Sequence, residues 1–408
     1  MESDKNTPRK NDTEKVHNFA QKLLQPSLIE KLRSYVAWQR DVRAGIDSVP
    51  PNDAPISINL DLTTACNYRC GHCVDSRIIN RSIAFEHENL LSSLDTLCRK
   101  GMRSVILIGG GEPTLYPGFE EVVSLLKSRG ADVAVVTNGS NMQKVGQIAH
   151  LFGEKDWLRL SLDSGTNETF RAMHRPHAAI SLEQICQDVK SLKQHHPNVV
   201  IGFSYVITWE GVNIKGREIT PNINEIAIAA RLAREHGFNF FSIKPILERD
   251  PSSAEVVGIP SKFSETIEKI GTAIRVAREL ETDNFRVLVS SNLRALKDDS
   301  LEAYKDQPEN CHMTHFRNVL SPFGLFNCPA CRGMEGASFG GKDSYAGDQN
   351  YGATMVQRAR HIHSFNAKLK CRDVTCLYSP TNKYIEELIR HKGVSELKPS
   401  EEKGDYFL

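Results

Sequence analysis

Three cysteines within eight residues form the strongest chemical signal in the sequence. Cys66, Cys70 and Cys73 lie in the segment ACNYRCGHC, directly after the apolar run 56–62. Thiolates at this density favour zinc, copper(I) or an iron–sulfur cluster over burial in a core. His72 offers a fourth ligand for zinc, but structural zinc usually takes its ligands from two separated pairs. We therefore first consider an iron–sulfur cubane on three cysteines, which keeps one iron open for a ligand.

A second group of cysteines lies far along the chain. Five of the ten cysteines belong to it, namely Cys311, Cys328, Cys331, Cys371 and Cys376. Disulfides explain them poorly, because we expect no export signal in a chain that starts with polar residues and is long enough to bury a core. A structural zinc site and an iron–sulfur cluster are the two alternatives for this group.

The elements that must position these thiols follow a strand–helix rhythm. Continuous apolar runs such as SVILI and VAVVT are typical of strands buried on both faces of a parallel sheet. Six such units imply right-handed crossovers and an α/β sheet, open or curled toward a barrel. The predicted strands are 56–62, 104–108, 132–137, 157–162, 199–207 and 239–247, with a seventh candidate at 285–289.

The sequence divides into three parts. Residues 1–55 form a polar lead-in, which we expect to be disordered, and two capping helices separated by Pro26. Residues 56–305 carry the strand–helix units. In residues 306–408 the rhythm stops, so we predict a small α+β domain. It contains a hairpin in RNVLSPFGLFNC, glycine-rich loops and a short helix near 381–391.

The cysteine loop resembles a known family signature. Cys66-x3-Cys70-x2-Cys73 is similar to the motif of the radical S-adenosylmethionine (radical SAM) superfamily. Three further family motifs follow in order, each after a predicted strand: Gly110-Gly111-Glu112-Pro113, Thr137-Asn138-Gly139 and Ser161-Leu162-Asp163. The resemblance covers about residues 56–250 and implies a partial (β/α)6 barrel of the TIM type. Parallel α/β folds bind ligands at these carboxyl ends of strands.

The resemblance also implies cofactors and chemistry. A 4Fe–4S cluster on Cys66, Cys70 and Cys73 would bind the amino and carboxylate groups of SAM at its open iron. One electron would then split SAM into methionine and a 5′-deoxyadenosyl radical that abstracts hydrogen from a substrate. Glu112 would accept hydrogen bonds from the SAM ammonium, and Gly110 and Gly111 would let the backbone approach closely.

Other positions receive cofactor-binding roles from the same resemblance. The carbonyl of His72 would face the adenine, and Ser161 and Asp163 are candidates for the ribose hydroxyls. Lys244, in the sixth strand, faces the proposed site and either contacts SAM or substrate or snorkels along an apolar wall. Simpler explanations exist for these residues: a tight turn at Gly110–Gly111, a helix N-cap at Asp163 or Ser164, and turn chemistry at Thr137–Asn138.

A loop after the fourth strand is a weaker candidate. The residues Met173, His174, Arg175, Pro176 and His177 either hold an anionic substrate group or form an ordinary solvated loop.

The second cysteine group resembles the auxiliary-cluster extension called SPASM in its full form and twitch in its truncated form. The five cysteines present allow at most one auxiliary 4Fe–4S cluster. The twitch pattern selects Cys311, Cys328, Cys371 and Cys376 and leaves Cys331 over. The choice between Cys328 and Cys331 stays open, and structural zinc is the alternative.

Composition limits the possible partners. The 408 residues carry 51 basic and 50 acidic side chains, without the basic tract that nucleic-acid binding requires. The sequence has no apolar stretch of the roughly 20 residues that span a bilayer. We therefore expect a cytoplasmic protein that binds neither membrane nor nucleic acid and that receives electrons from a flavodoxin or ferredoxin.

These observations predict a radical SAM enzyme of the oxidoreductase or lyase type. Its predicted substrate is a polar small molecule such as a sugar, an aminocyclitol or a nucleoside, changed by dehydrogenation, decarboxylation or epimerisation. The first alternative is a ribosomal-peptide-modifying enzyme that epimerises or crosslinks its substrate. An alternative of another class is a non-catalytic metal-binding protein.

Overall fold

A single curled sheet organises the protein. We describe residues 18–177, 179–249, 254–391 and 397–408 of a computed structural model. Ten strands pair in the order β11-β8-β5-β4-β3-β2-β1-β12-β13-β14; neighbours from β11 to β12 are parallel, and the last two pairs are antiparallel. The strands are β1 (Ser57–Leu60), β2 (Ser104–Leu107), β3 (Asp132–Thr137), β4 (Trp157–Ser161), β5 (Val200–Ile207), β8 (Phe240–Pro245), β11 (Arg286–Val289), β12 (Arg317–Ser321), β13 (Gly324–Phe326) and β14 (Ser338–Gly340).

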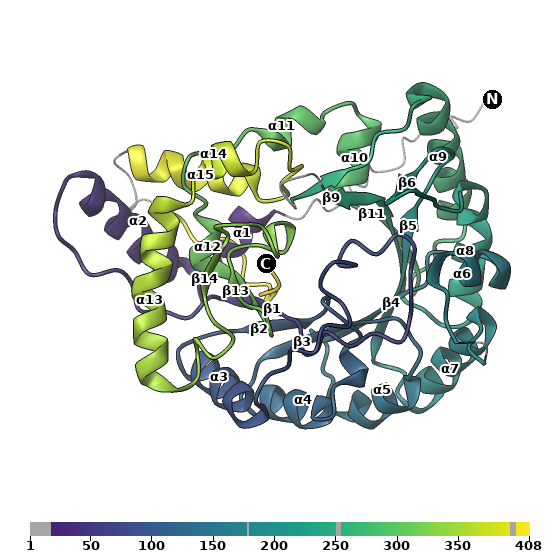
Figure 1. The fold of residues 1–408 in the computed structure, drawn as a ribbon, viewed down its shortest axis with the longest axis horizontal. Coiled ribbons are helices and arrows are strands. Elements are labelled where there is room, and N and C mark those ends of the chain that lie inside the picture. Colours follow the sequence, from purple (N-terminus) through teal and green to yellow (C-terminus); the bar gives the residue numbers. More distant parts are fainter. Residues whose placement is uncertain (1–17, 178, 250–253, 392–396) are drawn as a thin grey trace, which may run out of the picture.

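Helices cover the outside of this sheet. Figure 1 looks into the ring of strands, with α3 to α9 around its outer face and the loop after β1, in dark blue, inside the ring. The helices are α1 (Phe19–Leu23), α2 (Ile29–Arg43), α3 (His87–Arg99), α4 (Phe119–Ser128), α5 (Met142–Ile148), α6 (Asn167–His174), α7 (Leu182–His195), α8 (Ile226–Glu235), α9 (Phe263–Arg278), α10 (Ser291–Lys297), α11 (Leu301–Lys305), α12 (Met313–Phe316), α13 (Gly347–Ser364), α14 (Ala367–Lys370) and α15 (Ser379–Arg390).

Alternation along the strands separates the two faces of the sheet. Leu158 and Leu160 on β4, and Phe241 and Ile243 on β8, are fully buried in the main hydrophobic core. This core fills the space between the strands and the outer helices, since successive side chains of a strand point to opposite faces. The residues between them, such as Arg159, therefore point into the ring.

The prediction of a partial TIM-type barrel is confirmed. All six predicted strands form where the apolar runs lie, and the candidate at 285–289 becomes β11. The two helices flank Pro26 as expected, whereas the predicted disordered lead-in lies outside the described residues. Among the described residues, no helix is long and apolar enough to cross a membrane.

Two features of residues 306–408 differ from the prediction. The hairpin forms, but its first strand, β12, pairs in parallel with β1 and so extends the barrel sheet. The predicted glycine-rich loops instead contain α13, with 18 residues. Its buried face includes the polar side chains Thr354, Arg358 and His361, so apolar periodicity does not reveal it.

Two short hairpins were also not predicted. One joins β6 (Asn213–Ile214) to β7 (Arg217–Glu218), and the other joins β9 (Leu247–Arg249) to β10 (Glu255–Val257).

The last residues pack against the beginnings of several barrel strands. Tyr406 accepts a hydrogen bond through its carbonyl from Ser104 at 2.7 Å, and the ring of Phe407 lies 5.5 Å from that of Trp157. Leu408 is buried with the N-terminal helices and α15 in a second core. This segment therefore covers the amino ends of β2 and β4, opposite the edge at which the cysteine loop lies.

Candidate functional site

The loop that carries Cys66, Cys70 and Cys73 follows β1 at the carboxyl edge of the sheet. All three cysteines are half-buried and free of disulfides. Loop contacts fix its backbone: Cys66 N donates to Asn80 Oδ1 at 2.9 Å, and Asn80 N donates to the Thr64 carbonyl at 2.6 Å. The chain therefore folds back on itself around the thiols.

The three thiols share one environment of low polarity. Burial raises the pKa of Cys70 well above its usual value, and the neighbouring thiols of Cys73 and Cys66 raise it further. Burial is also the main reason why the pKa of Cys73 rises to about 12. A bound metal centre would offset this cost, since it deprotonates its thiol ligands. This donor set fits a cluster held by three cysteines.

The glycine turn after β2 packs directly on the cysteine loop. Gly110 has a φ of +66°, and a Cβ at Gly111 would lie 2.4 Å from the Ala65 carbonyl and 2.6 Å from that of Thr63. Only glycine fits at position 111 without moving the loop.

Glu112 joins three of the predicted motifs. Its side chain is buried; Oε1 accepts from the backbone and hydroxyl of Thr114 and, at 2.6 Å, from the hydroxyl of Thr137. Its Oε2 accepts from Asn138 N at 2.7 Å, while Asn138 Nδ2 donates to Asn67 of the cysteine loop at 2.9 Å. Burial raises the pKa of Glu112, and these hydrogen bonds oppose the rise. The site thus brings Glu112, Thr137 and Asn138 together.

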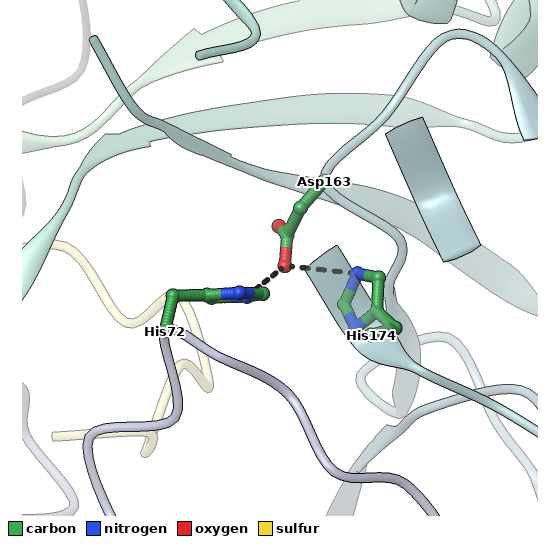
Figure 2. Close-up of side chains that lie close together, drawn as sticks. All are labelled: His72, Asp163 and His174. Carbon is green, nitrogen blue, oxygen red and sulfur yellow. Dashed lines mark hydrogen bonds and ion pairs between the residues drawn. The ribbon is translucent and has the colours of Figure 1, made fainter. Parts of the chain in front are cut away.

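Asp163 holds two histidines from different parts of the chain. Figure 2 shows the rings of His72 and His174 directed at one carboxylate oxygen, with nitrogen–oxygen distances of 3.0 and 3.4 Å. The other oxygen accepts from Val206 N at 2.7 Å. Burial opposes ionisation of Asp163, but the hydrogen bonds from His72 and from Val206 N favour the carboxylate and leave its pKa lowered. One ligand atom from each of the three residues lies within 4.8 Å of the others, a spacing also compatible with a metal ion.

His174, the last residue of α6, connects this group to the cysteines. It is buried, so the prediction of a solvated loop is wrong at this position. Burial lowers its pKa to about 4, so its ring is neutral at pH 7. Nε2 lies 3.0 Å from the Leu162 carbonyl, which can only accept, so we infer that Nε2 carries the proton. Nδ1 then faces Cys70 Sγ at 3.3 Å as an acceptor.

Ser161 and Lys244 lie on the inner faces of β4 and β8. Both are partly exposed. Burial, followed by repulsion from Arg159, lowers the pKa of Lys244 to about 7. These two predicted residues therefore face the inside of the barrel, while the other motif residues lie at its carboxyl edge.

The second cysteine group also converges. All five thiols line one cavity, together with Gln307, Met313, Arg317, Asn327, Ala330, Ala367, Val374, Tyr378 and Asn382. Cys331 Sγ lies 3.8 Å from Cys371 Sγ, and a hydrogen bond from Cys331, followed by the charge of Arg317, lowers the pKa of Cys328 to about 6. Cys331 therefore lines the same cavity as the four cysteines of the twitch pattern and lies beside one of them.

A buried ionic network links the two cysteine groups. Arg332, next to Cys331, pairs with Asp61 at 3.0 Å and with Asp75 at 2.6 Å. Arg249 pairs with Asp75 at 3.0 Å and with Glu255 at 3.1 Å. Asp75 follows Cys73 by two residues, so the network runs from one loop to the other. Its members are distant in sequence and on four different segments, and no local pattern predicts it.

Comparison with known proteins identifies the domain. The family model of the Radical SAM superfamily matches residues 60–218. An S-adenosylmethionine-dependent nucleotide dehydratase from Thermoplasmatales archaeon (strain ISO4-H5) is 35% identical over 108 residues, 26% of this chain and 38% of the relative. The mycofactocin maturase MftC of Mycobacterium tuberculosis (strain H37Rv) is 32% identical over 118 residues, 28% of this chain and 29% of MftC. The chain thus spans less than half the length of either relative.

Solved structures share the fold. The crystal structure of Streptococcus suis SuiB has a TM-score of 0.55 and 15% identity, over 87% of this chain and 76% of SuiB.

The predictions of an enzyme and of its main cofactors are confirmed. Radical SAM enzymes use a 4Fe–4S cluster and SAM, and the match begins at β1 and includes the three-cysteine loop. The alternative of a non-catalytic metal-binding protein is set aside. Residues 60–218 therefore form a domain of the radical SAM superfamily.

Proposed function

We propose that this enzyme abstracts hydrogen from a polar small molecule of the nucleoside or nucleotide type. The observation that carries the proposal is the meeting of three free thiols, Glu112 and Asp163 at one edge of a barrel whose inner face carries serines and two cations. A polar inner face suits a polar substrate better than an apolar one. The dehydratase relative, whose name gives a nucleotide substrate, supports this class.

In this proposal Cys66, Cys70 and Cys73 hold the 4Fe–4S cluster. When bound, the cluster and SAM supply the electron and the carbon radical. Glu112 Oε2 has one donor, whereas Oε1 has three, so Oε2 keeps capacity to accept from the SAM ammonium. Gly110 and Gly111 keep the turn close to the loop.

The remaining SAM contacts stay as predicted from the motifs. The His72 carbonyl would face the adenine. Ser161 and Asp163 would take the ribose hydroxyls. Thr137 and Asn138 would support Glu112, which they already contact.

We further propose one auxiliary 4Fe–4S cluster in residues 306–408, on four of the five cysteines Cys311, Cys328, Cys331, Cys371 and Cys376. The cavity that all five line supports this, and structural zinc is the alternative. Anaerobic reconstitution separates the two: two cubanes give about eight irons per chain, and zinc at the second site leaves about four.

Deuterium transfer tests the proposed reaction. Candidate nucleosides and nucleotides, deuterated on the sugar, are incubated with reconstituted enzyme, SAM and a reduced flavodoxin or ferredoxin. Label in 5′-deoxyadenosine supports the proposal and locates the abstracted hydrogen. Cleavage of SAM without label from any of these substrates, but with label from a deuterated peptide, would contradict it.

Peptide modification is the second candidate. The MftC relative, named as a maturase, favours it, although the alignment covers 28% of this chain and 29% of MftC. Epimerisation or crosslinking of a ribosomal peptide is the corresponding chemistry.

A further inference from the structure

A polar strip crosses the inner face of three adjacent strands. Strand register pairs Ser161 of β4 with Ser204 of β5, and Ser204 with Ser242 of β8, so three hydroxyls lie side by side. Arg159 precedes this row on β4 and Lys244 follows it on β8, both on the same face because side chains alternate. We call these five residues the lumen strip.

Solvent reaches the lumen strip from inside the barrel. Arg159, Ser161, Ser242 and Lys244 are partly exposed, although β4 and β8 each have a paired strand on both sides. The alternate residues of these strands are fully buried under the outer helices. The exposed surface of the lumen strip therefore faces the interior of the ring, where a substrate would lie below the cysteine loop.

The two cations of the lumen strip carry a surplus of positive charge. Among the described residues, no carboxylate lies within ion-pair distance of Arg159 or Lys244, and Arg159 Nε is buried without a hydrogen-bond partner. Asp163 is the acid that acts on both, and its oxygens are already engaged by His72 and Val206 N. Arg159 and the partly charged Lys244 face one engaged carboxylate, so they leave a positive charge that a bound anion would offset and that would favour the charged form of Lys244.

The hydroxyls between the cations are also free. No hydrogen bond joins the side chains of Ser161, Ser204 or Ser242 to the part of the chain that the structure describes. The guanidinium of Arg159 lies over the ring of Trp157, with 5.5 Å from Cζ to the centroid, and among the described residues no acid pairs with its fork. Arginine forks bind phosphate and carboxylate through two parallel hydrogen bonds, and lysine acts as a point charge beside them.

We propose that the lumen strip binds an anionic oxygen group of the substrate, a phosphoryl or a carboxylate, through Arg159 and Lys244 with the serine hydroxyls as donors. This inference rests on the proposed function and narrows its substrate class from polar to anionic small molecules. Lys244 then acts on the substrate rather than on SAM.

Ligand pairs that differ only in the anion test the proposal. Binding to reconstituted enzyme with SAM is measured by calorimetry for cytidine 5′-monophosphate against cytidine, and for glucuronate against glucose. The wild type should prefer the anionic member of one pair by at least about tenfold, because charge-assisted hydrogen bonds are roughly twice as strong as those between neutral groups. The phosphate pair and the sugar-acid pair tell the two sources of the anion apart.

Variants assign the preference to the lumen strip. Arg159→Gln and Lys244→Met should reduce the preference for the anionic ligand to about twofold or less. Lys244→Arg keeps the charge and should retain this preference. The exposed Arg234→Gln on α8 and Lys190→Met on α7 are the matched controls and should bind like the wild type. Circular dichroism of each variant confirms folding, and Lys244→Arg provides a readout if Lys244→Met does not fold.

Two results would overturn the proposal. One is the absence of a preference for the anion in both pairs. The other is that Arg159→Gln and Lys244→Met bind SAM more weakly but keep the preference for the anionic ligand. The two cations would then bind the carboxylate of SAM and not the substrate. Failure of the proposed function is separate: 5′-deoxyadenosine would then carry label from a deuterated peptide and from none of the deuterated nucleosides or nucleotides, whatever the anion preference in binding.

Discussion

At the scale of single residues, Gly111 makes the tightest backbone contact in the site. A methyl group there would meet two carbonyls of the cysteine loop at 2.4 and 2.6 Å, and backbone atoms cannot move aside as a flexible side chain can. The position of the thiols therefore depends on a residue that has no side chain.

Gly111→Ala should displace the cysteine loop and lower both stability and iron content. The expected loss in the free energy of unfolding is about 1–3 kcal/mol, as for overpacked cores. Chemical denaturation and iron analysis of the reconstituted protein measure the two effects. Gly271→Ala in α9 is the control, because its new Cβ meets no atom within 4 Å; it should leave iron unchanged and raise helix stability slightly. Equal effects in both variants would contradict this role of Gly111.

Asp61 makes stability depend on pH in an unusual direction. Burial, followed by repulsion from Asp75, raises its pKa to about 7 despite the nearby Arg332. The unfolded chain releases this proton near pH 4, so between about pH 4 and pH 7 the folded protein holds the extra proton. The stabilisation that this proton gives to the folded protein is complete below the pKa of Asp61 in the unfolded chain. It is lost as the pH rises through the pKa of Asp61 in the folded protein.

Asp61→Asn should flatten this pH dependence. The wild type should lose stability from pH 5 to pH 8 and the variant should not lose it in the same way. The free energy of unfolding of the variant minus that of the wild type should therefore rise by about 1 kcal/mol or more over this range. Urea denaturation at both values measures the difference. Asp283→Asn, at an exposed position, should follow the wild type. A parallel decline in Asp61→Asn and the wild type would show that Asp61 ionises normally.

At the scale of elements, Arg332 joins the loop after β13 to the loop after β1. Its guanidinium also lies under the glycine turn, where a Cβ at Gly109 would meet it at 2.8 Å. Three carboxylates, Asp61, Asp75 and Glu255, share two arginines, and burial is the main reason why the pKa of Glu255 rises to about 7. The network thus fixes how the two cysteine loops sit relative to each other.

Arg332→Met should destabilise the protein strongly, because it leaves buried carboxylates without compensation. The expected loss is about 3–5 kcal/mol in the free energy of unfolding. Thermal unfolding and iron analysis measure it, and both cysteine groups should lose metal. Adding Asp61→Asn in the same chain should recover part of the loss, since one buried charge is removed. Arg332→Met with wild-type stability would show that the network has no structural importance.

The sequence predicts the elements better than it predicts their contacts. All six strands and the motifs at their ends are local patterns, and a parallel sheet places Glu112, Thr137 and Asp163, at the carboxyl ends of β2, β3 and β4, along one edge. Helix α13 is not predicted from the sequence, because its buried face carries Arg358 and other polar groups. The ionic network and the His174–Cys70 contact are not predicted either, because they join segments that are far apart in sequence.

At the scale of the whole molecule, the final residues tie the N-terminal helices to the barrel. Lys22 of α1 pairs with Asp405 at 3.0 Å and donates to the Phe407 carbonyl at 2.5 Å. Tyr406 and Phe407 contact β2 and β4, and Leu408 is 3% exposed. One short segment thus joins both cores.

Deletion of Asp405–Leu408 should lower the melting temperature. Loss of the buried Leu408 and of the aromatic contact predicts a cost of about 2–4 kcal/mol. Calorimetry measures it, with the exposed substitution Lys403→Ala as the control. An unchanged melting temperature after the deletion would contradict the role of this segment.

The most direct test of the whole account is whether SAM binds the cluster of the three-cysteine loop. In a chain with Cys371→Ala and Cys376→Ala, which leaves one cluster to observe, electron paramagnetic resonance of the anaerobically reduced protein is recorded with and without SAM. We expect a reduced 4Fe–4S spectrum that changes on addition of SAM and that is lost in a further Cys70→Ala variant. A spectrum that SAM leaves unchanged, or that persists without Cys70, would contradict it.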